Sequence, residues 1–167
     1  MSAVTAFLTR TPVIIVSFVT MILVGLSFMS VMQSIDGPLL DTLLSGEAAR
    51  ARLAEMTIEQ RYIHFLGTVV NDTLYPFAYG SFFAGLAGRF APEKLRGWVM
   101  LPALSAAVID LVENTVQALA LYGSIDLLNL KDVLTPAKYG LFMLAAIIAI
   151  GFAAFALARW LVKSLQS

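Results

Sequence analysis

Residues Thr11 to Ile35 read TPVIIVSFVTMILVGLSFMSVMQSI, and none of them is charged. A bilayer core about 30 Å thick is crossed by about 20 apolar residues of α-helix, so this stretch predicts a first membrane span at about residues 12–33. The run is longer than the apolar region of a cleaved signal peptide, which has about 7–15 residues, and no A-x-A-like cleavage motif follows it. We therefore interpret it as a retained membrane anchor.

Three more apolar stretches follow the first one. They predict spans at about residues 62–88, 97–122 and 138–160. The whole chain is 59% hydrophobic and 13% charged, with a mean hydropathy of +0.85, whereas soluble domains are about 45–50% apolar and about 25% charged. The predicted fold class is therefore all-α, an integral-membrane four-helix bundle that forms a single transmembrane domain over residues 1–167. A short, partly helical outer loop is expected between the first two spans.

Composition also excludes several kinds of function. The 11 Lys and Arg residues are balanced by 11 Asp and Glu residues, so no basic excess indicates nucleic acid as a partner. The chain has no cysteine, which excludes disulfides, thiolate catalysis and Cys-ligated metal centres. His64 is the only histidine, which excludes a haem held by two histidines, and we interpret it as an interfacial side chain beside Tyr62. These residues specify no cofactor, and the partner that the composition indicates is the lipid bilayer.

The charged flanks of the spans predict an orientation, because cytoplasmic loops of membrane proteins carry an excess of Lys and Arg. One set of flanks holds a dense group of basic residues and a single acid, Glu93. The basic residues are Arg10, Arg89, Lys94, Arg96, Arg159 and Lys163. The opposite flanks, which include loops 34–61 and 123–137, mix basic residues with a larger number of acids. We therefore expect a multi-pass protein of the bacterial inner (plasma) membrane, with both termini in the cytoplasm and these two loops outside.

The first outer loop contains local signals of its own. Residues 39–55 are expected to form one or two short helices on the membrane surface, with leucines dipping into the bilayer. These leucines are Leu39, Leu40, Leu43, Leu44 and Leu53. The sequence Thr57-Ile58-Glu59-Gln60 matches a capping box, which predicts that the second helix begins near Ile58. Pro136 is expected in the first turn of the fourth helix, because its fixed φ angle suits a helix start.

Small residues recur every four positions on two of the predicted spans. They are Gly80, Ala84 and Gly88 on the second span, and Ala145, Ala149 and Ala153 on the fourth. Because lipid tails are as apolar as leucine, membrane helices associate through close packing of small residues and through polar contacts. We interpret both faces as contacts within one bundle, with a homo-oligomer interface as the alternative.

Three acidic residues, Asp72, Asp110 and Glu113, lie inside the predicted spans. A charged side chain near the bilayer centre costs about 2.5–3.5 kcal/mol on insertion scales, so such groups face the bundle interior, pair, or become protonated. Asp72, Tyr75 and Tyr79 share one face of the second helix, at positions i, i+3 and i+7. The corresponding polar face of the third helix consists of Asp110, Glu113, Asn114 and Gln117.

The two polar faces also match in depth. Asp72 and Glu113 each lie about four residues, roughly 6 Å, from the middle of their spans toward the outer side. We therefore expect the two faces to lie opposite each other inside the bundle. Pro76 deprives the carbonyl of Asp72 of its usual helical amide partner, so that carbonyl is available to a ligand or to another hydrogen-bond donor.

These motifs carry a resemblance. The pattern Asp72-x-x-Tyr75-Pro76-x-x-Tyr79 on one helix, followed by Asp110-x-x-Glu113-Asn114 on the next, is similar to a pattern in a group of small uncharacterised bacterial membrane proteins with four spans. In that group the fourth span also begins with a lysine, here Lys138. The resemblance covers most of the chain after the first outer loop. It implies a shared four-helix architecture and a shared polar site, and it implies no activity.

We expect the polar faces to form a site that opens to the outer side and binds a cation or a small ligand. The expected ligand-binding residues are Asp72, Tyr75, Tyr79, Asp110, Glu113, Asn114, Gln117 and Lys138. If the ligand is a metal ion, its expected ligands are Asp72, Asp110 and Glu113, and oxygen ligands of this kind suit Na⁺, Ca²⁺, Mg²⁺ or Mn²⁺. Such a protein would serve in transport, in sensing, or as an accessory subunit of a larger membrane complex.

Two other functions fit the same residues. An enzyme acting on a lipid or isoprenoid substrate would use the paired carboxylates as acid and base, although the lack of a nucleophile–base pair disfavours catalysis. A purely structural subunit would use the polar stripe to hold its helices in register, since interhelical hydrogen bonds average about 0.6 kcal/mol in membranes. Lys138 has two interpretations, because it either snorkels to the interface or points inward and pairs with Asp72.

Overall fold

The computed structural model describes residues 3–166, and every regular element in that range is helical. In chain order the α-helices are α1 (Ala3–Leu8), α2 (Thr11–Ser34), α3 (Gly46–Glu55), α4 (Ile58–Gly67), α5 (Thr73–Phe90), α6 (Arg96–Tyr122) and α7 (Lys131–Leu165). The shorter helical turns are η1 (Leu40–Thr42), η2 (Thr68–Asp72), η3 (Glu93–Leu95) and η4 (Leu128–Leu130). The all-α fold class predicted from the sequence is therefore confirmed.

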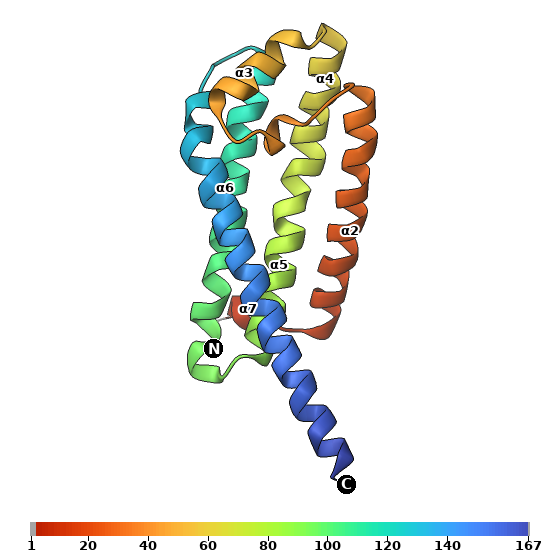
Figure 1. Ribbon diagram of the computed structural model, residues 1–167, viewed down its shortest axis with the longest axis vertical. Coiled ribbons are helices and arrows are strands. Elements are labelled where there is room, and N and C mark those ends of the chain that lie inside the picture. Colours follow the sequence, from red (N-terminus) through yellow and green to blue (C-terminus); the bar gives the residue numbers. More distant parts are fainter. Residues whose placement is uncertain (1–2, 167) are drawn as a thin grey trace.

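The long helices lie side by side and alternate in direction (Figure 1). α4, η2 and α5 follow one another without a gap, so residues 58–90 form one continuous rod with a π-helical turn at η2. α5 is the central element, because it packs on α2, α6 and α7. The chain begins and ends at the end of the bundle that carries the α5–α6 connection, and α3 lies at the opposite end (Figure 1).

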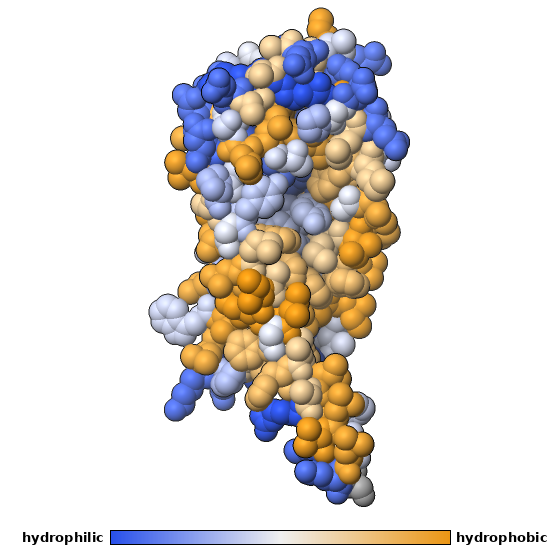
Figure 2. All heavy atoms as spheres, viewed as in Figure 1, coloured by the Kyte–Doolittle hydropathy of each residue, from blue (hydrophilic) through white to orange (hydrophobic). Residues whose placement is uncertain are grey.

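Three segments are long and apolar enough to cross a membrane: Thr11–Ser34, Glu93–Tyr122 and Leu128–Leu165. They contain the expected first, third and fourth spans. The expected second span, at 62–88, falls on the continuous rod and is not one of these three segments. Figure 2 shows hydrophobic atoms over the middle of the bundle and hydrophilic atoms gathered toward its ends, which is the surface pattern of a membrane protein.

The rod of residues 58–90 begins where the sequence predicts, whereas α7 begins earlier than predicted. The Thr57 hydroxyl accepts a hydrogen bond from the Gln60 backbone N–H, and the Gln60 side chain accepts one from the Thr57 N–H, so the predicted capping box is confirmed. α7 begins at Lys131, which places Pro136 inside the helix rather than in its first turn. The added turn is stabilised because the side chains of Lys131 and Thr135 bind a buried carboxylate of α6, Glu113.

The segment between α2 and α4 packs onto the protein rather than into the bilayer. Leu39 and Leu40 are buried in a hydrophobic cluster that also contains Leu128, so the expectation that they dip into the membrane is wrong. Gly46 accounts for the close fit, because a Cβ atom there would collide with the carbonyl oxygen of Leu128. Of the expected leucines, Leu44 is the exposed one.

Small residues bring α5 and α6 close together. A Cβ atom on Gly80 would lie 2.9 Å from the Cβ of Ala107 on α6. The expected small residues of α5, which are Gly80, Ala84 and Gly88, are all buried. Ala145 and Ala149 of α7 belong to the same buried cluster. These positions therefore form contacts within the chain, as interpreted from the sequence, whereas Ala153, the last small residue expected on this face of α7, is half-buried.

Candidate functional site

A group of polar side chains lies inside the bundle, toward the end that carries α3. α6 contributes Asp110, Glu113, Asn114 and Gln117 from one face, and each of these residues is no more than 5% exposed. η2 contributes Asp72, which is also 5% exposed. The two polar faces found in the sequence therefore both point inward, as expected.

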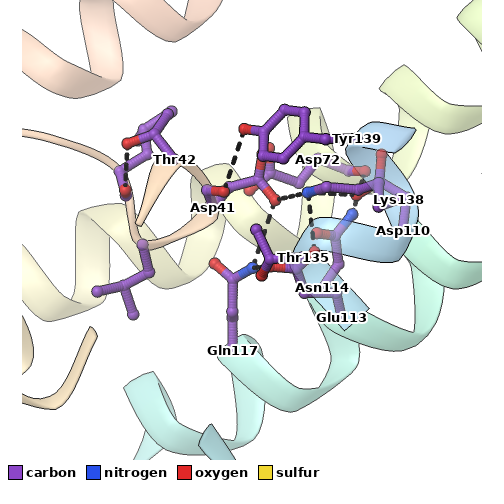
Figure 3. Close-up of polar contacts among 12 residues, drawn as sticks. Asp41, Thr42, Asp72, Asp110, Glu113, Asn114, Gln117, Thr135, Lys138 and Tyr139 are labelled. Carbon is purple, nitrogen blue, oxygen red and sulfur yellow. Dashed lines mark hydrogen bonds and ion pairs between the residues drawn. The ribbon is translucent and has the colours of Figure 1, made fainter. Parts of the chain in front are cut away.

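Lys138 of α7 lies at the centre of this group (Figure 3). Its Nζ is 2.5 Å from Oδ1 of Asp41, 3.3 Å from Oδ1 of Asp110 and 2.9 Å from Oε2 of Glu113. The side chain is 4% exposed, so the interpretation as a snorkelling lysine is wrong. The inward orientation is the correct alternative, but its ion-pair partners are these three carboxylates and not Asp72.

Glu113 is the most heavily contacted carboxylate of the group. Its Oε1 forms an ion pair with Lys131 Nζ and accepts a hydrogen bond of 2.6 Å from the Thr135 hydroxyl. Gln117 Nε2 donates to the same oxygen at 3.3 Å. Glu113 and Lys131 are both fully buried, so each charge depends on the other for its stability in a low-dielectric environment.

We define the buried cluster as Asp41, Asp110, Glu113, Lys131, Thr135 and Lys138. The sequence analysis missed three of its members, namely Asp41, Lys131 and Thr135. Lys131, Thr135 and Lys138 stand at i, i+4 and i+7. If the fourth helix is extended toward the N-terminus, its helical period places Lys131 and Thr135 on the same face as Lys138. Asp41 has no comparable signal, because it reaches the cluster only through the position of η1.

The carbonyl group of Asp72 is bound by a side chain of α6. Asn114 Nδ2 donates to this carbonyl oxygen at 2.5 Å. Pro76, four residues later, has no N–H to donate, so the normal helical bond cannot form. The expected availability of this carbonyl is therefore confirmed, and the amide of Asn114 takes the place of the missing helical donor.

The two expected tyrosines play different parts. The Tyr79 hydroxyl donates to Asp110 Oδ2 at 3.1 Å and is buried. The ring of Tyr75 packs edge-on against the ring of Tyr79, with 5.5 Å between centroids, and against that of Phe28, with 5.4 Å. Phe142 of α7 extends the row on the other side of Tyr79, at 5.0 Å. The tyrosines therefore form the middle of an aromatic wall that continues onto α2 through Phe28 and onto α7 through Phe142.

A cavity of about 340 Å³ lies between this aromatic wall and the acidic groups. Asp72, Asp110 and Lys138 line its polar end. Gly25 and Phe28 of α2 line its apolar side. The cavity thus has one charged end and one apolar end.

Asp72 differs from the other buried acids in lacking a basic partner. Over residues 3–166 no Lys, Arg or His side chain forms an ion pair with its carboxylate, whereas Asp110 and Glu113 each pair with Lys138. The carboxylate nevertheless lines the cavity and is almost completely buried. A carboxylate in this position gains stability from any cation that enters the cavity.

The carboxylates could also be considered as metal ligands. Oxygen atoms of Asp41, Asp110 and Glu113 lie within 4.8 Å of one another, so Asp41 stands where the sequence analysis expected Asp72. The ammonium group of Lys138 contacts all three. The position that a metal ion would take is therefore held by a side chain of the protein.

His64 lies outside this site and connects two backbone segments. It is fully buried, so its interpretation as an interfacial side chain is wrong. Its Nε2 accepts a hydrogen bond of 2.9 Å from the backbone N–H of Leu40, and its Nδ1 lies 3.2 Å from the Thr68 hydroxyl. His64 thereby holds η1, and with it Asp41, against the α4–α5 rod.

Comparisons of this chain with protein-family models, with curated proteins and with solved structures found no match. The function proposed below therefore rests on the chemistry and geometry of the cavity.

Proposed function

We propose that this chain is a four-span protein of the bacterial inner membrane whose cavity binds a ligand that carries a positive charge. The observation that carries the proposal is the carboxylate of Asp72, which is buried, lines the cavity and has no basic partner among residues 3–166. A charge of this kind is unfavourable in a membrane interior unless it is paired. A cationic ligand supplies that pair.

The charges around the cavity favour a cation over an anion. Four buried or half-buried acids surround two buried lysines, Lys131 and Lys138. The acids are Asp41, Asp72, Asp110 and Glu113. When all six groups are ionised, two negative charges remain unbalanced, and a bound cation lowers that imbalance.

The proposed orientation places the α3 end outside the cell and both termini in the cytoplasm. It is supported by the basic residues at the other end of the bundle, among them Arg89 at the end of α5 and Arg96 at the start of α6. In this orientation the continuous rod of residues 58–90 is the second of four spans. The cavity then lies in the outer half of the membrane.

Cysteine labelling tests the orientation, because the chain has no native cysteine. Glu47→Cys in α3 and Gln166→Cys at the chain end are each treated on intact bacterial cells with a membrane-impermeant maleimide. We expect labelling of the first and none of the second until the cells are opened. Labelling of Gln166→Cys on intact cells would overturn the orientation.

Binding is tested with the purified full chain in uncharged dodecylmaltoside micelles. Na⁺, Ca²⁺, Mg²⁺, Mn²⁺ and tetramethylammonium are titrated, and affinity is measured by isothermal calorimetry. We expect at least one of these cations to bind, and we expect Asp72→Asn to weaken that binding at least tenfold. Glu47→Gln, which removes an exposed acid of α3, is the matched control and leaves the affinity unchanged. Failure of every cation to bind, or equal binding by Asp72→Asn, contradicts the proposal.

Two further readouts separate the alternatives. A lipid extract is analysed by mass spectrometry before and after incubation with the protein. The appearance of a chemically altered lipid would favour an enzyme over a binding protein. Purification in mild detergent is examined for a larger partner in fixed ratio. Such a partner, together with absent cation binding, would favour a structural subunit.

A further inference from the structure

α2 and α7 line opposite sides of the cavity, and we take the space between them as its opening toward the lipid. Gly25 and Met32 of α2 line one side, and Tyr139 and Phe142 of α7 line the other. The two helices both pack on α5 but do not pack closely on each other within the described chain. In Figure 1 they stand apart in the half of the bundle that carries α3, with α5 behind them and η1 above.

Polar and apolar surfaces meet around this opening. Met32 is 39% exposed and Tyr139 37% exposed at its two edges. Figure 2 shows polar side chains gathered on this face of the bundle, with hydrophobic surface beside and below them. In the proposed orientation, this boundary lets the apolar part of a ligand remain beside hydrophobic surface while its polar part enters the cavity.

The walls of the cavity match a positively charged group with an apolar attachment. Aromatic rings attract a cation that lies within about 6 Å of the ring centre, and cages of such rings recognise quaternary ammonium groups. Tyr75, Tyr79 and Phe142 form a continuous row of rings along the cavity. Asp72 lies at its polar end and supplies the opposite charge.

The volume of the cavity limits how much of a ligand it holds. About 340 Å³ is near the lower end of the range of about 300–1,000 Å³ for small-molecule pockets. It therefore has room for a charged head and a short length of alkyl chain. The rest of a longer chain would lie in the opening between α2 and α7, in contact with lipid.

We propose that the ligand is an amphiphilic amine or quaternary ammonium compound, which enters from the membrane between α2 and α7 and places its charged head beside Asp72. This inference rests on the proposed function and adds to it the class of ligand and its route. A small hydrated cation would satisfy the proposed function without satisfying this inference.

Gly25 provides a way to test the apolar half alone. A Cβ atom at this position would lie 3.7 Å from Tyr75 Cε2, which is ordinary contact, so a larger side chain fills the space beyond it. Gly25→Leu is therefore expected to block the apolar end of the cavity and to leave Asp72 unchanged. Gly151→Leu is the matched control, because Gly151 on α7 is exposed and has open space around its Cβ position.

The probes are dodecyltrimethylammonium and tetramethylammonium, which share a charged head and differ in the alkyl chain. Their binding to the full chain in dodecylmaltoside micelles is measured by equilibrium dialysis with radiolabelled probe. We expect dodecyltrimethylammonium to bind the unmodified chain at least tenfold more tightly than tetramethylammonium, beyond its partition into protein-free micelles. We expect Asp72→Asn to weaken both probes at least tenfold, whereas Gly25→Leu weakens only the long-chain probe and Gly151→Leu weakens neither.

The outcomes distinguish the two proposals. Equal affinity for the two probes, with Gly25→Leu binding both normally, overturns the lipid-side route and leaves a small-cation site. Binding of neither probe overturns this inference. If the inorganic cations also fail to bind, the proposed function falls with it. Circular dichroism and gel filtration of each variant ensure that a loss of binding is not a loss of folding.

Discussion

Lys138 Nζ on α7 lies 2.5 Å from Asp41 Oδ1 on η1, although the two residues are 97 positions apart in the chain. This contact joins the last long helix to the segment between α2 and α4. The same ammonium group also pairs with Asp110 and Glu113 of α6. One lysine therefore balances carboxylates from two separate parts of the fold, and it closes the polar end of the cavity.

Replacing Lys138 is expected to destabilise the protein strongly. In Lys138→Met the carboxylates of Asp110 and Glu113 lose a shared cation, and removing one partner of a buried ion pair costs about 3–5 kcal/mol. The free energy of unfolding is measured by titration with dodecyl sulfate in mixed micelles. Lys163→Met, on an exposed turn of the same helix, should change it by less than about 0.5 kcal/mol. A loss no larger than that of the control would show that the pairing contributes no stability.

Asn114 and Pro76 are expected to be energetically coupled. Asn114→Ala leaves the carbonyl of Asp72 without a donor, which costs about 1–3 kcal/mol for a buried group. Pro76→Ala restores a backbone N–H at the position that normally bonds this carbonyl. In the Pro76→Ala background, Asn114→Ala should therefore cost less than it does alone. Dodecyl sulfate titrations of the two single variants and the double variant give the coupling free energy. If the losses in unfolding free energy are strictly additive, the Asn114 amide does not take the place of the missing backbone donor.

Gly80 is expected to be intolerant of a side chain. Because its Cβ would lie 2.9 Å from that of Ala107, Gly80→Ala forces α5 and α6 apart, and overpacking of this kind costs about 1–3 kcal/mol. Gly140→Ala is the matched control, since the space around Gly140 on α7 is open. Thermal unfolding followed by circular dichroism should show a lower melting temperature for the first variant only. Equal melting temperatures would mean that the helices adjust to the added methyl group.

His64 is expected to hold the segment that carries Asp41. In His64→Ala the backbone N–H of Leu40 loses its buried acceptor, at a cost of about 1–3 kcal/mol, and the segment should open more often. Limited trypsin digestion after Arg50 and Arg52 in α3 should then be several times faster. His64→Gln offers a replacement acceptor and should restore part of the protection. Unchanged cleavage in His64→Ala would show that other contacts are sufficient to hold the segment.

Asp126 is expected to give the connection between α6 and α7 an acid-sensitive contact. Arg50 binds both carboxylate oxygens, at 2.6 and 3.0 Å, and these bonds hold the pKa of Asp126 below its ordinary value of 3.8. A carboxyl group with a lowered pKa stabilises the folded state above the ordinary value, and this contribution disappears as the pH falls through the lowered one.

The prediction for Asp126 therefore has a defined pH range. At pH 6 to 8, Asp126→Asn should lower the melting temperature by no more than about 2–4 °C, because the pair is exposed. The difference should shrink as the pH falls below about 4. Melting temperatures of Asp126→Asn and of the unmodified chain are compared across this range, with Glu47→Gln as the control. A difference that grows toward acid pH would contradict the sign of the shift.

Local sequence patterns predicted the features that depend on a few neighbouring residues. The capping box at Thr57 and Gln60 is closed within one turn, so its residue types were sufficient to locate a helix start. The inward face of Asp110 and Glu113 follows from helical period and from the cost of placing acids against lipid. The carbonyl of Asp72 was identified from Pro76 alone, because the missing N–H lies four residues away.

Such local patterns do not predict contacts between segments that are distant in the chain. The sequence alone places Lys131 in an outer loop, because its burial depends on the packing of η4 and the first turn of α7 against α6. It also places Asp41 among the loop acids, and only the fold of η1 brings Asp41 to Lys138. The prediction that Leu40 enters the bilayer is wrong because a leucine buried by protein and one buried by lipid look the same in sequence.

Residue types and helical period indicate an all-helical, strongly apolar chain in which Asp72, Asp110 and Glu113 occupy inward faces. Which charges meet depends on how the helices pack. Lys131 and Lys138 balance the acids of α6, whereas Asp72 faces the cavity without a basic partner in the described part of the chain. Helical periodicity links residues three or four positions apart, whereas an ion pair links whichever side chains the packing of helices brings within 4 Å.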